Sequence, residues 1–163
     1  SGAWRYLIGD TIKFTSKEYN EIIITGRTKH FLNLCGEHLS IENMDRAIQL
    51  TSEQLNIAIP EYAVTGIKYG TMFAHKWYIA TDSNMSPEII KEKIDSNLKI
   101  LNDDYRVERL EAIKDVIVEV LKPEVFYLWM RSKGKEGGQN KFPRVLKKEL
   151  RKEWEEFIKN NKI

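Results

Sequence analysis

The chain has 163 residues, of which 42% are hydrophobic and 31% charged, a composition typical of a globular protein and unlike that of disordered or collagen-like chains. Its 26 basic residues nearly balance 24 acidic ones, and a net charge of +2 argues against a nucleic acid bound mainly through its phosphates. One cysteine, Cys35, leaves no internal disulfide and favours a reducing, cytoplasmic location, and no stretch reaches the roughly 20 apolar residues that a membrane span requires.

The chain opens with a segment that contains only strands and turns. Short β-rich runs predict strands at 4–8, 11–16 and 21–25, and Gly9-Asp10 marks the turn between the first two. About 25 residues cannot bury a core alone. We therefore expect residues 1–28 to be the trailing β segment of a larger, truncated N-terminal domain, together with a hinge.

A mixed domain is expected from residue 29 onward. After a strand at 30–35, Ser40 is a suitable N-cap for a helix that carries Glu42 in its first turn. Strands at about 61–69 and 72–81 form a hairpin around 69–71. The expected apolar face of this first helix is Ile41, Met44, Ile48, Thr51 and Leu55.

Three more helices and one strand complete this domain. Ser86-Pro87-Glu88 opens a helix in the order favoured at helix starts: a cap, a proline in the first turn and an acidic residue. Apolar and polar residues alternate over 115–121, which predicts a strand, and Pro123 starts a helix that ends near Gly134. The inward residues expected on the first two of these helices are Ile90, Ile94, Leu98 and Leu101, and then Phe126 and Trp129. A last helix is expected after Pro143, with one apolar stripe of Leu146, Leu150, Trp154, Phe157 and Ile158. The order of elements predicts an α+β fold for 29–163, with about four helices.

A glycine-rich loop, KGKEGGQNKFPR (133–144), surrounds one lysine, Lys141. Glycines this dense predict a mobile backbone. An ammonium group is a compact, movable charge that stabilises phosphate oxygens or a developing oxyanion, and a closing domain can deliver it. The pattern alone is more typical of an ordinary surface loop. The residues expected to support the lysine are Gly137, Gly138, Gln139 and Asn140.

Three charged residues near the seam between the two segments are further candidates. Asp10 ends a strand, where a carboxylate can accept hydrogen bonds from a ribose diol or can simply complete a turn. Arg27 and Lys29 follow Gly26, and they fit either a phosphate contact at a pivot or a solvated strand end.

The histidines and the cysteine predict no further chemistry. His30, His38 and His75 do not have the spacing of metal ligands, so no metal site is expected from protein side chains. His30 and His75 fall on predicted strands as polar-face residues. His38 lies close enough to the first helix to approach a ligand, but its position is more typical of a structural residue. Cys35 is expected to fill core space.

Four segments, in this order, resemble one known family. They are YLIGDTIKFTS (6–16), GRTKHFLNLCGEHLSIENMDRAI (26–48), LNDDY (101–105) and KGKEGGQNKFPR (133–144). They resemble the carboxy-terminal third of the auxin-responsive-promoter (Gretchen Hagen three) family, specifically its bacterial members. These are acyl acid amido synthetases of the adenylate-forming superfamily.

The resemblance implies an ATP-dependent ligase. ATP with Mg, bound mainly by the missing N-terminal domain, would activate a carboxylic acid as its acyl adenylate, and an amine such as an amino acid would then accept the acyl group. By this resemblance Asp10 holds the ribose hydroxyls with help from Arg27, Lys29 is the hinge, and Lys141 is the mobile catalytic lysine. The partners implied are the carboxylic acid, the amine and the chain's own N-terminal domain, and the fragment alone is expected to be inactive.

Two features depart from the family pattern. Leu7 stands where the family motif has Arg, although Arg5 lies on the same strand face, and His38 stands where plant members carry a lysine. Two other functions remain open at this point. One is an acyl-CoA ligase-like adenylate-forming enzyme, and the other is a binding module without catalysis.

Overall fold

The computed structural model describes residues 10–27, 31–33, 36–135 and 141–161. In chain order these form β1 (Asp10–Ser16), β2 (Glu21–Arg27), β3 (Phe31–Leu32), β4 (Leu39–Ser40), α1 (Ile41–Leu55), β5 (Tyr62–Tyr69), β6 (Met72–Ala80), α2 (Pro87–Leu101), α3 (Asp103–Glu111), β7 (Ile113–Leu121), α4 (Pro123–Ser132) and α5 (Lys148–Asn160). The α+β class expected from the sequence is confirmed, with five helices in the described ranges instead of about four.

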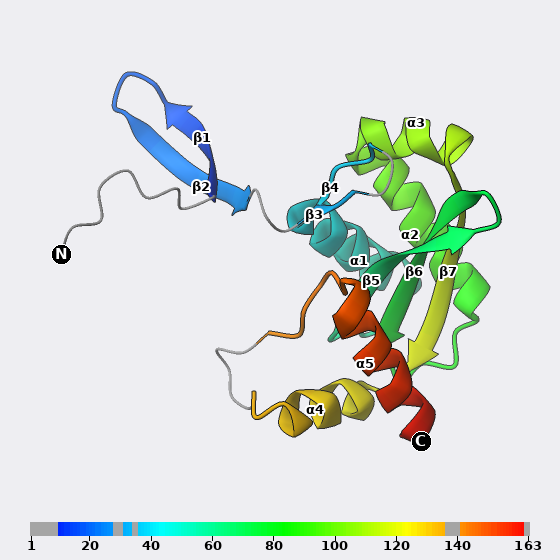
Figure 1. The fold of residues 1–163 in the computed structure, drawn as a ribbon. Helices are drawn as coiled ribbons and strands as arrows, with labels where there is room; N and C mark the ends of the chain where they lie inside the picture. Colours follow the sequence, from blue (N-terminus) through cyan, green and yellow to red (C-terminus); the bar gives the residue numbers. More distant parts are fainter. Residues whose placement is uncertain (1–9, 28–30, 34–35, 136–140, 162–163) are drawn as a thin grey trace.

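A three-stranded sheet in the order β5-β6-β7 organises the larger body (Figure 1). β5 and β6 form the predicted antiparallel hairpin, which turns at Gly70 with a φ of +62° that favours glycine. β6 and β7 run parallel, so the chain must cross over between them, and α2 and α3 form that crossover. β6 is thus the central strand.

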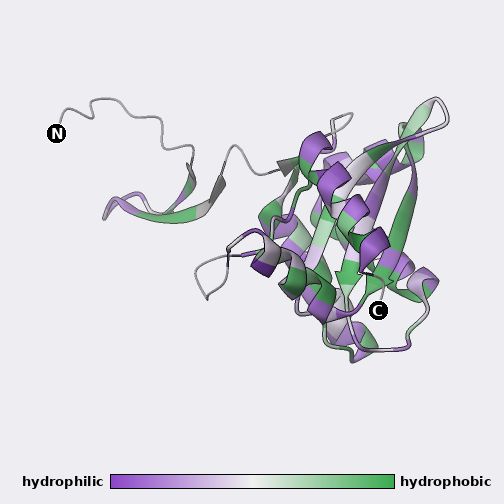
Figure 2. Ribbon diagram, turned by 60° about the horizontal axis from the view of Figure 1, so that its bottom comes forward, coloured by the Kyte–Doolittle hydropathy of each residue, from purple (hydrophilic) through white to green (hydrophobic). Residues whose placement is uncertain are grey.

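Helices cover both faces of this sheet. Side chains alternate along β6, so Trp77 and Ile79 enter a core shared with α1 and α2, whereas Tyr78 and Ala80 enter a second core shared with α4 and α5. Figure 2 shows the result: hydrophobic strands lie inside, and hydrophilic turns of the helices face outward.

The predicted helix starts at Ser40 and Ser86 are confirmed at atomic detail, whereas the last helix begins only at Lys148, so Leu146, expected on its apolar face, precedes it. Ser40 Oγ accepts a hydrogen bond from the Asn43 backbone N–H at 3.1 Å, and Asn43 Oδ1 accepts one from the Ser40 N–H at 3.3 Å, which makes a reciprocal capping box. Ser86 Oγ accepts from the Glu88 N–H at 3.3 Å, with Pro87 in the first turn. The buried members of the predicted faces are Met44, Ile48, Thr51, Ile90, Ile94, Leu98, Phe126, Trp129, Leu146, Trp154 and Ile158.

The additional helix, α3, is held by a polar cluster. Asn102 caps it by accepting a hydrogen bond from the Tyr105 N–H at 2.6 Å. Asp95 of α2 accepts from the Tyr105 hydroxyl at 2.7 Å and from Arg109 Nε at 2.7 Å. Burial alone would raise the pKa of Asp95, but hydrogen bonds from Arg109, Lys99 and Tyr105 outweigh it and hold that pKa below its usual value.

The N-terminal hairpin of β1 and β2 confirms the strands predicted at 11–16 and 21–25, while the strand predicted at 4–8 lies outside the described residues. Both hairpin strands expose large apolar side chains, including Phe14 at 50% and Ile24 at 68%. Only Phe31 and Leu32 of the predicted 30–35 strand are described as a strand, paired with β4. Within the described chain, no helix has the length and apolar character needed to cross a membrane.

Candidate functional site

The structure places two of the predicted nucleotide-binding residues opposite each other. Asp10 and Arg27 are paired positions in the antiparallel register of β1 and β2. The sequence did not predict this pairing, because it depends on the β1–β2 register. Lys29 and the four loop residues Gly137, Gly138, Gln139 and Asn140 lie outside the described residues.

Lys141 is exposed, and the residue that follows it is buried. Phe142 is only 2% exposed, and its ring centroid lies 4.8 Å from that of Phe126 and 5.0 Å from those of Trp129 and Trp154. No described carboxylate forms an ion pair with Lys141. The ammonium group is therefore free to meet a ligand, while its backbone is joined directly to a fixed aromatic anchor.

Arg144 provides a second anchor downstream. Its guanidinium lies over the Tyr62 ring at 4.4 Å and donates to the Tyr62 carbonyl at 3.1 Å. It also pairs with Glu61, and with Asp45 at 3.6 Å. Three kinds of contact from one partly buried side chain hold this segment to the start of β5.

The backbone beyond Arg144 then adds to the sheet. The Val64 N–H donates to the Arg144 carbonyl and the Leu146 N–H donates to the Val64 carbonyl, both at 2.8 Å. Thr65 Oγ1 donates to the Leu146 carbonyl, also at 2.8 Å. Residues 142–146 are thereby fixed to β5 and to the aromatic core at once.

The other side of the glycine-rich loop is also fixed. α4 ends in a turn in which Gly134 has a φ of +66° and the Lys135 N–H donates to the Met130 carbonyl at 3.0 Å. Lys133 pairs with Glu153 of α5 and lies over the Trp129 ring at 5.6 Å. Thus residues 135 and 141, on either side of the undescribed loop segment, are both attached to the α4–α5 side of the sheet.

His75 corrects a prediction. It was expected on a polar strand face, but its side chain is fully buried and its Nε2 lies 3.0 Å from Oε1 of Glu37, which is also fully buried. The His75 ring packs against Tyr105 with centroids 5.6 Å apart. This pair fixes the loop before α1 to the central strand. A strand pattern could not reveal it, because Glu37 belongs to a loop and becomes a neighbour only through folding.

His38 lies in the same loop but is exposed, with a φ of +41°. Its Nδ1 lies 3.1 Å from Nδ2 of Asn33, whose Oδ1 accepts from the Gly36 N–H at 2.8 Å. The contact is a local one within the loop. Within the described ranges no group of three or more His, Cys, Asp or Glu side chains is arranged to hold a metal ion.

A family model described as "GH3 family C-terminal domain" matches residues 42–150, which is well over half of the chain. The chain belongs to the GH3 family. This confirms the family expected from the four motifs. Lys141 lies inside the matched range of the GH3 domain, whereas Asp10, Arg27 and Lys29 precede it.

Solved structures share the fold of this GH3 domain. A structure titled "GH3.15 acyl acid amido synthetase" superposes with a TM-score of 0.74 at 17% identity, covering 96% of this chain and 30% of that one. A second, "AtGH3.15 acyl acid amido synthetase in complex with 2,4-DB", gives a TM-score of 0.71 at 18% identity with the same coverage. The GH3 domain therefore spans about 30% of the length of these solved relatives. No curated protein sequence matches it.

Proposed function

We propose that this GH3 domain is the catalytic-lysine-bearing part of an ATP-dependent acyl acid amido synthetase. A carboxylate oxygen of the acid attacks the α-phosphorus of ATP, which forms the acyl adenylate and releases pyrophosphate. An amine then attacks the acyl carbon, loses a proton and displaces AMP, giving the amide. Mg²⁺ accompanies the ATP and offsets its phosphate charge.

The observation that carries this proposal is the setting of Lys141. An exposed ammonium next to the buried Phe142, inside the range that matches the GH3 model, suits a cation that must reach a ligand bound on another domain. Negative charge on the phosphates and the carboxylate is largest during adenylation, so a lysine there stabilises that transition state. During amine attack the same cation is not required, which favours its removal between steps.

The hairpin and the seam after it supply the second part of the proposal. Residues 1–28 belong with a larger N-terminal domain that holds most of the ATP site, and residues 29–163 turn against it. Asp10, supported by Arg27, binds the ribose hydroxyls, and Lys29 lies at the pivot. The paired positions of Asp10 and Arg27, and the apolar side chains that the hairpin exposes, support this arrangement.

The experiment is acid-dependent exchange of labelled pyrophosphate into ATP by the full-length protein. We expect exchange with a suitable carboxylic acid, amide formation with an amino acid, and no exchange by the 163-residue chain alone. Formation of an acyl-CoA product with CoA in place of an amino acid would show that the protein is an acyl-CoA ligase and not an amido synthetase. No exchange with any acid in a broad panel would leave a non-catalytic binding domain.

A further inference from the structure

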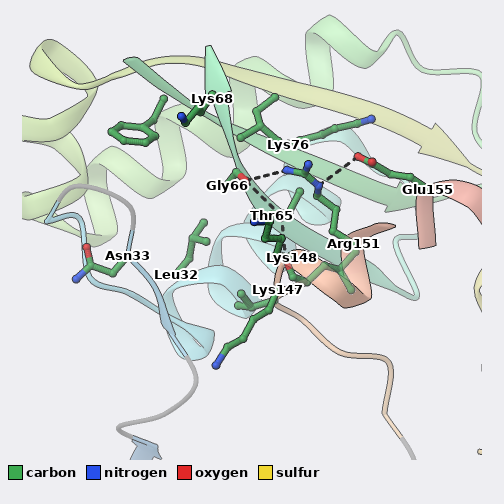
Figure 3. A pocket seen from close by; sticks show the side chains of 14 residues that line it. Leu32, Asn33, Thr65, Gly66, Lys68, Lys76, Lys147, Lys148, Arg151 and Glu155 are labelled. Carbon is green, nitrogen blue, oxygen red and sulfur yellow. Dashed lines mark hydrogen bonds and ion pairs between the residues drawn. The ribbon is translucent and has the colours of Figure 1, made fainter. Parts of the chain in front are cut away.

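A groove of about 790 Å³ follows the outer edge of β5 (Figure 3). Leu32 and Asn33, at the end of β3, lie on one side of it, and Lys148 and Arg151, in the first turns of α5, lie on the other. In the described part of the chain, β5 is the edge strand of its sheet. The floor of the groove is therefore a strand edge.

Hydrogen bonds show which backbone groups of β5 face outward. The Ala80 N–H donates to the Glu61 carbonyl at 2.9 Å, so the odd-numbered positions of β5 are those bonded to β6. The even-numbered positions then face the outer edge, as Val64 does when it exchanges hydrogen bonds with Arg144 and Leu146. The first half of this edge is thus already occupied by residues 144–146, through an isolated parallel bridge between Val64 and Val145.

The second half of the edge is open. Gly66 and Lys68 continue the even-numbered series, and no described strand pairs with them on the outer side. The Gly66 carbonyl accepts hydrogen bonds from Arg151 Nη1 at 3.3 Å and from the Thr65 hydroxyl at 3.5 Å. The Gly66 N–H and both backbone groups of Lys68 remain directed into the groove, offering donors and an acceptor in the spacing of a strand.

The two walls of the groove differ in chemistry. One wall lies on the sheet face that packs against α1 and α2. Lys68 shares this face with Val64 and is paired with Phe73, so the wall consists of Leu32, Phe73 and the stem of Lys68. The opposite wall, on the α5 face, carries Lys76 and Arg151 and the start of α5. A strand placed between the walls would direct alternate side chains to an apolar side and to a basic side.

Positive charge is concentrated around this groove although the chain is nearly neutral. The basic side chains that line it are Lys68, Lys76, Lys147, Lys148 and Arg151, against the single acid Glu155. Lys76 pairs with Glu119 at 2.9 Å and Arg151 with Glu155 at 3.7 Å. No described carboxylate forms an ion pair with the other three lysines, so the groove holds an excess of positive charge.

We infer that this groove binds an extended acidic segment of a partner protein, which adds to the outer edge of β5 at Gly66 and Lys68. Backbone hydrogen bonds to the edge supply affinity, and alternate side chains supply specificity, acidic toward Lys148 and Arg151 and apolar toward Leu32. The inference does not depend on the proposed ligase activity. It requires only the edge, the walls and the charges of this domain.

Lysines on an edge strand also have a protective use, because they discourage unwanted strand pairing. Lys68 alone would fit that use. Lys147, Lys148 and Arg151 come from a different element and build a wall beside the edge, which protection does not require. The same edge already forms a parallel bridge with residues 144–146, so pairing there is compatible with the fold.

The test uses the 163-residue chain and a fluorescein-labelled hexapeptide in which glutamate alternates with valine. Binding is followed by fluorescence anisotropy and by amide hydrogen exchange in NMR spectra. We expect saturable binding that weakens with salt, with slower exchange at the Gly66 and Lys68 amides. A peptide of the same composition with its glutamates and valines in two blocks should bind several-fold more weakly, because it cannot match both walls.

Two pairs of variants separate the edge from the charge. Lys68→Pro removes the outward amide and leaves the bonds to β6, so it should weaken binding roughly three- to tenfold beyond Lys68→Ala, which removes only the charge. Lys148→Glu should weaken binding about tenfold, while Lys152→Glu, an exposed change on α5 outside the groove, should not. Equal binding of the two peptides, equal effects of the two Lys68 variants, unchanged exchange at Gly66 and Lys68, or no binding would each overturn the inference.

Discussion

Replacing Phe142 by alanine tests how the segment that carries Lys141 is anchored. The ring is 2% exposed and has three aromatic neighbours with centroids 4.8 to 5.0 Å away, so the change leaves a cavity in the core between α4 and α5. Phe→Ala substitutions at buried positions cost about 3 to 5 kcal/mol of unfolding free energy, and aromatic pairs add roughly 0.5 to 1.5 kcal/mol beyond burial. We expect a loss of about 4 kcal/mol for Phe142→Ala, in the middle of the cavity range.

The assay is urea unfolding of the 163-residue chain, followed by the fluorescence of tryptophans that include Trp129 and Trp154 beside the ring. Phe14→Ala is the matched control: that ring is 50% exposed on β1, so its loss should change stability by less than about 0.5 kcal/mol. In the full-length protein, Phe142→Ala should also slow pyrophosphate exchange. A stability loss below about 1 kcal/mol, or an equal loss for Phe14→Ala, would refute the anchoring role.

Three further outcomes are expected from urea unfolding of the chain. His75→Ala should cost about 1 to 3 kcal/mol, since it removes the buried ring whose Nε2 lies 3.0 Å from Oε1 of the buried Glu37, and a loss as small as that of a surface change would contradict this. Asp95→Asn should destabilise the chain by about 3 kcal/mol at neutral pH because Arg109 loses its partner. The folded pKa of Asp95 lies below its unfolded value of about 3.9, so the stability that this carboxylate contributes is present above that pH and is lost as pH falls through the folded pKa. A difference in unfolding free energy between wild type and Asp95→Asn that stayed constant down to about pH 2 would contradict this. Ile24→Lys, on the exposed hairpin, should leave the unfolding free energy within about 0.5 kcal/mol of the parent, and a larger loss would show that the hairpin packs on the body.

Local signals in the sequence predicted most elements of the fold. Ser40 and Ser86 act through neighbours two or three residues away, so the pattern that predicts a cap is also the one that forms it. α3 was not predicted because it is short and only Tyr105 among its residues is buried, which leaves no apolar stripe. Its start signal was present, since Asn102 precedes two aspartates in the first turn.

The tertiary features of the site could not be predicted in this way. The burial of His75 depends on Glu37, which is distant along the chain, and strand periodicity is the same whether a polar side chain meets water or a buried partner. The groove along β5 exists because residues 144–146 pair with Val64 and stop short of Gly66. Lys141 was predicted from its motif. The anchoring of the next residue, Phe142, was not, because it depends on aromatic rings of α4 and α5 that only folding brings together.

The most direct test of the proposed function compares the two half-reactions in the full-length protein with Lys141→Ala. We predict that pyrophosphate exchange falls by at least about a hundredfold, the order expected for loss of one group that stabilises transition-state charge, while amide formation from preformed acyl adenylate changes little. Lys135→Ala, which removes another exposed lysine on the other side of the loop, should leave both steps unchanged. Equal losses of the two half-reactions in Lys141→Ala, or no loss of exchange, would contradict a role for this lysine in adenylation.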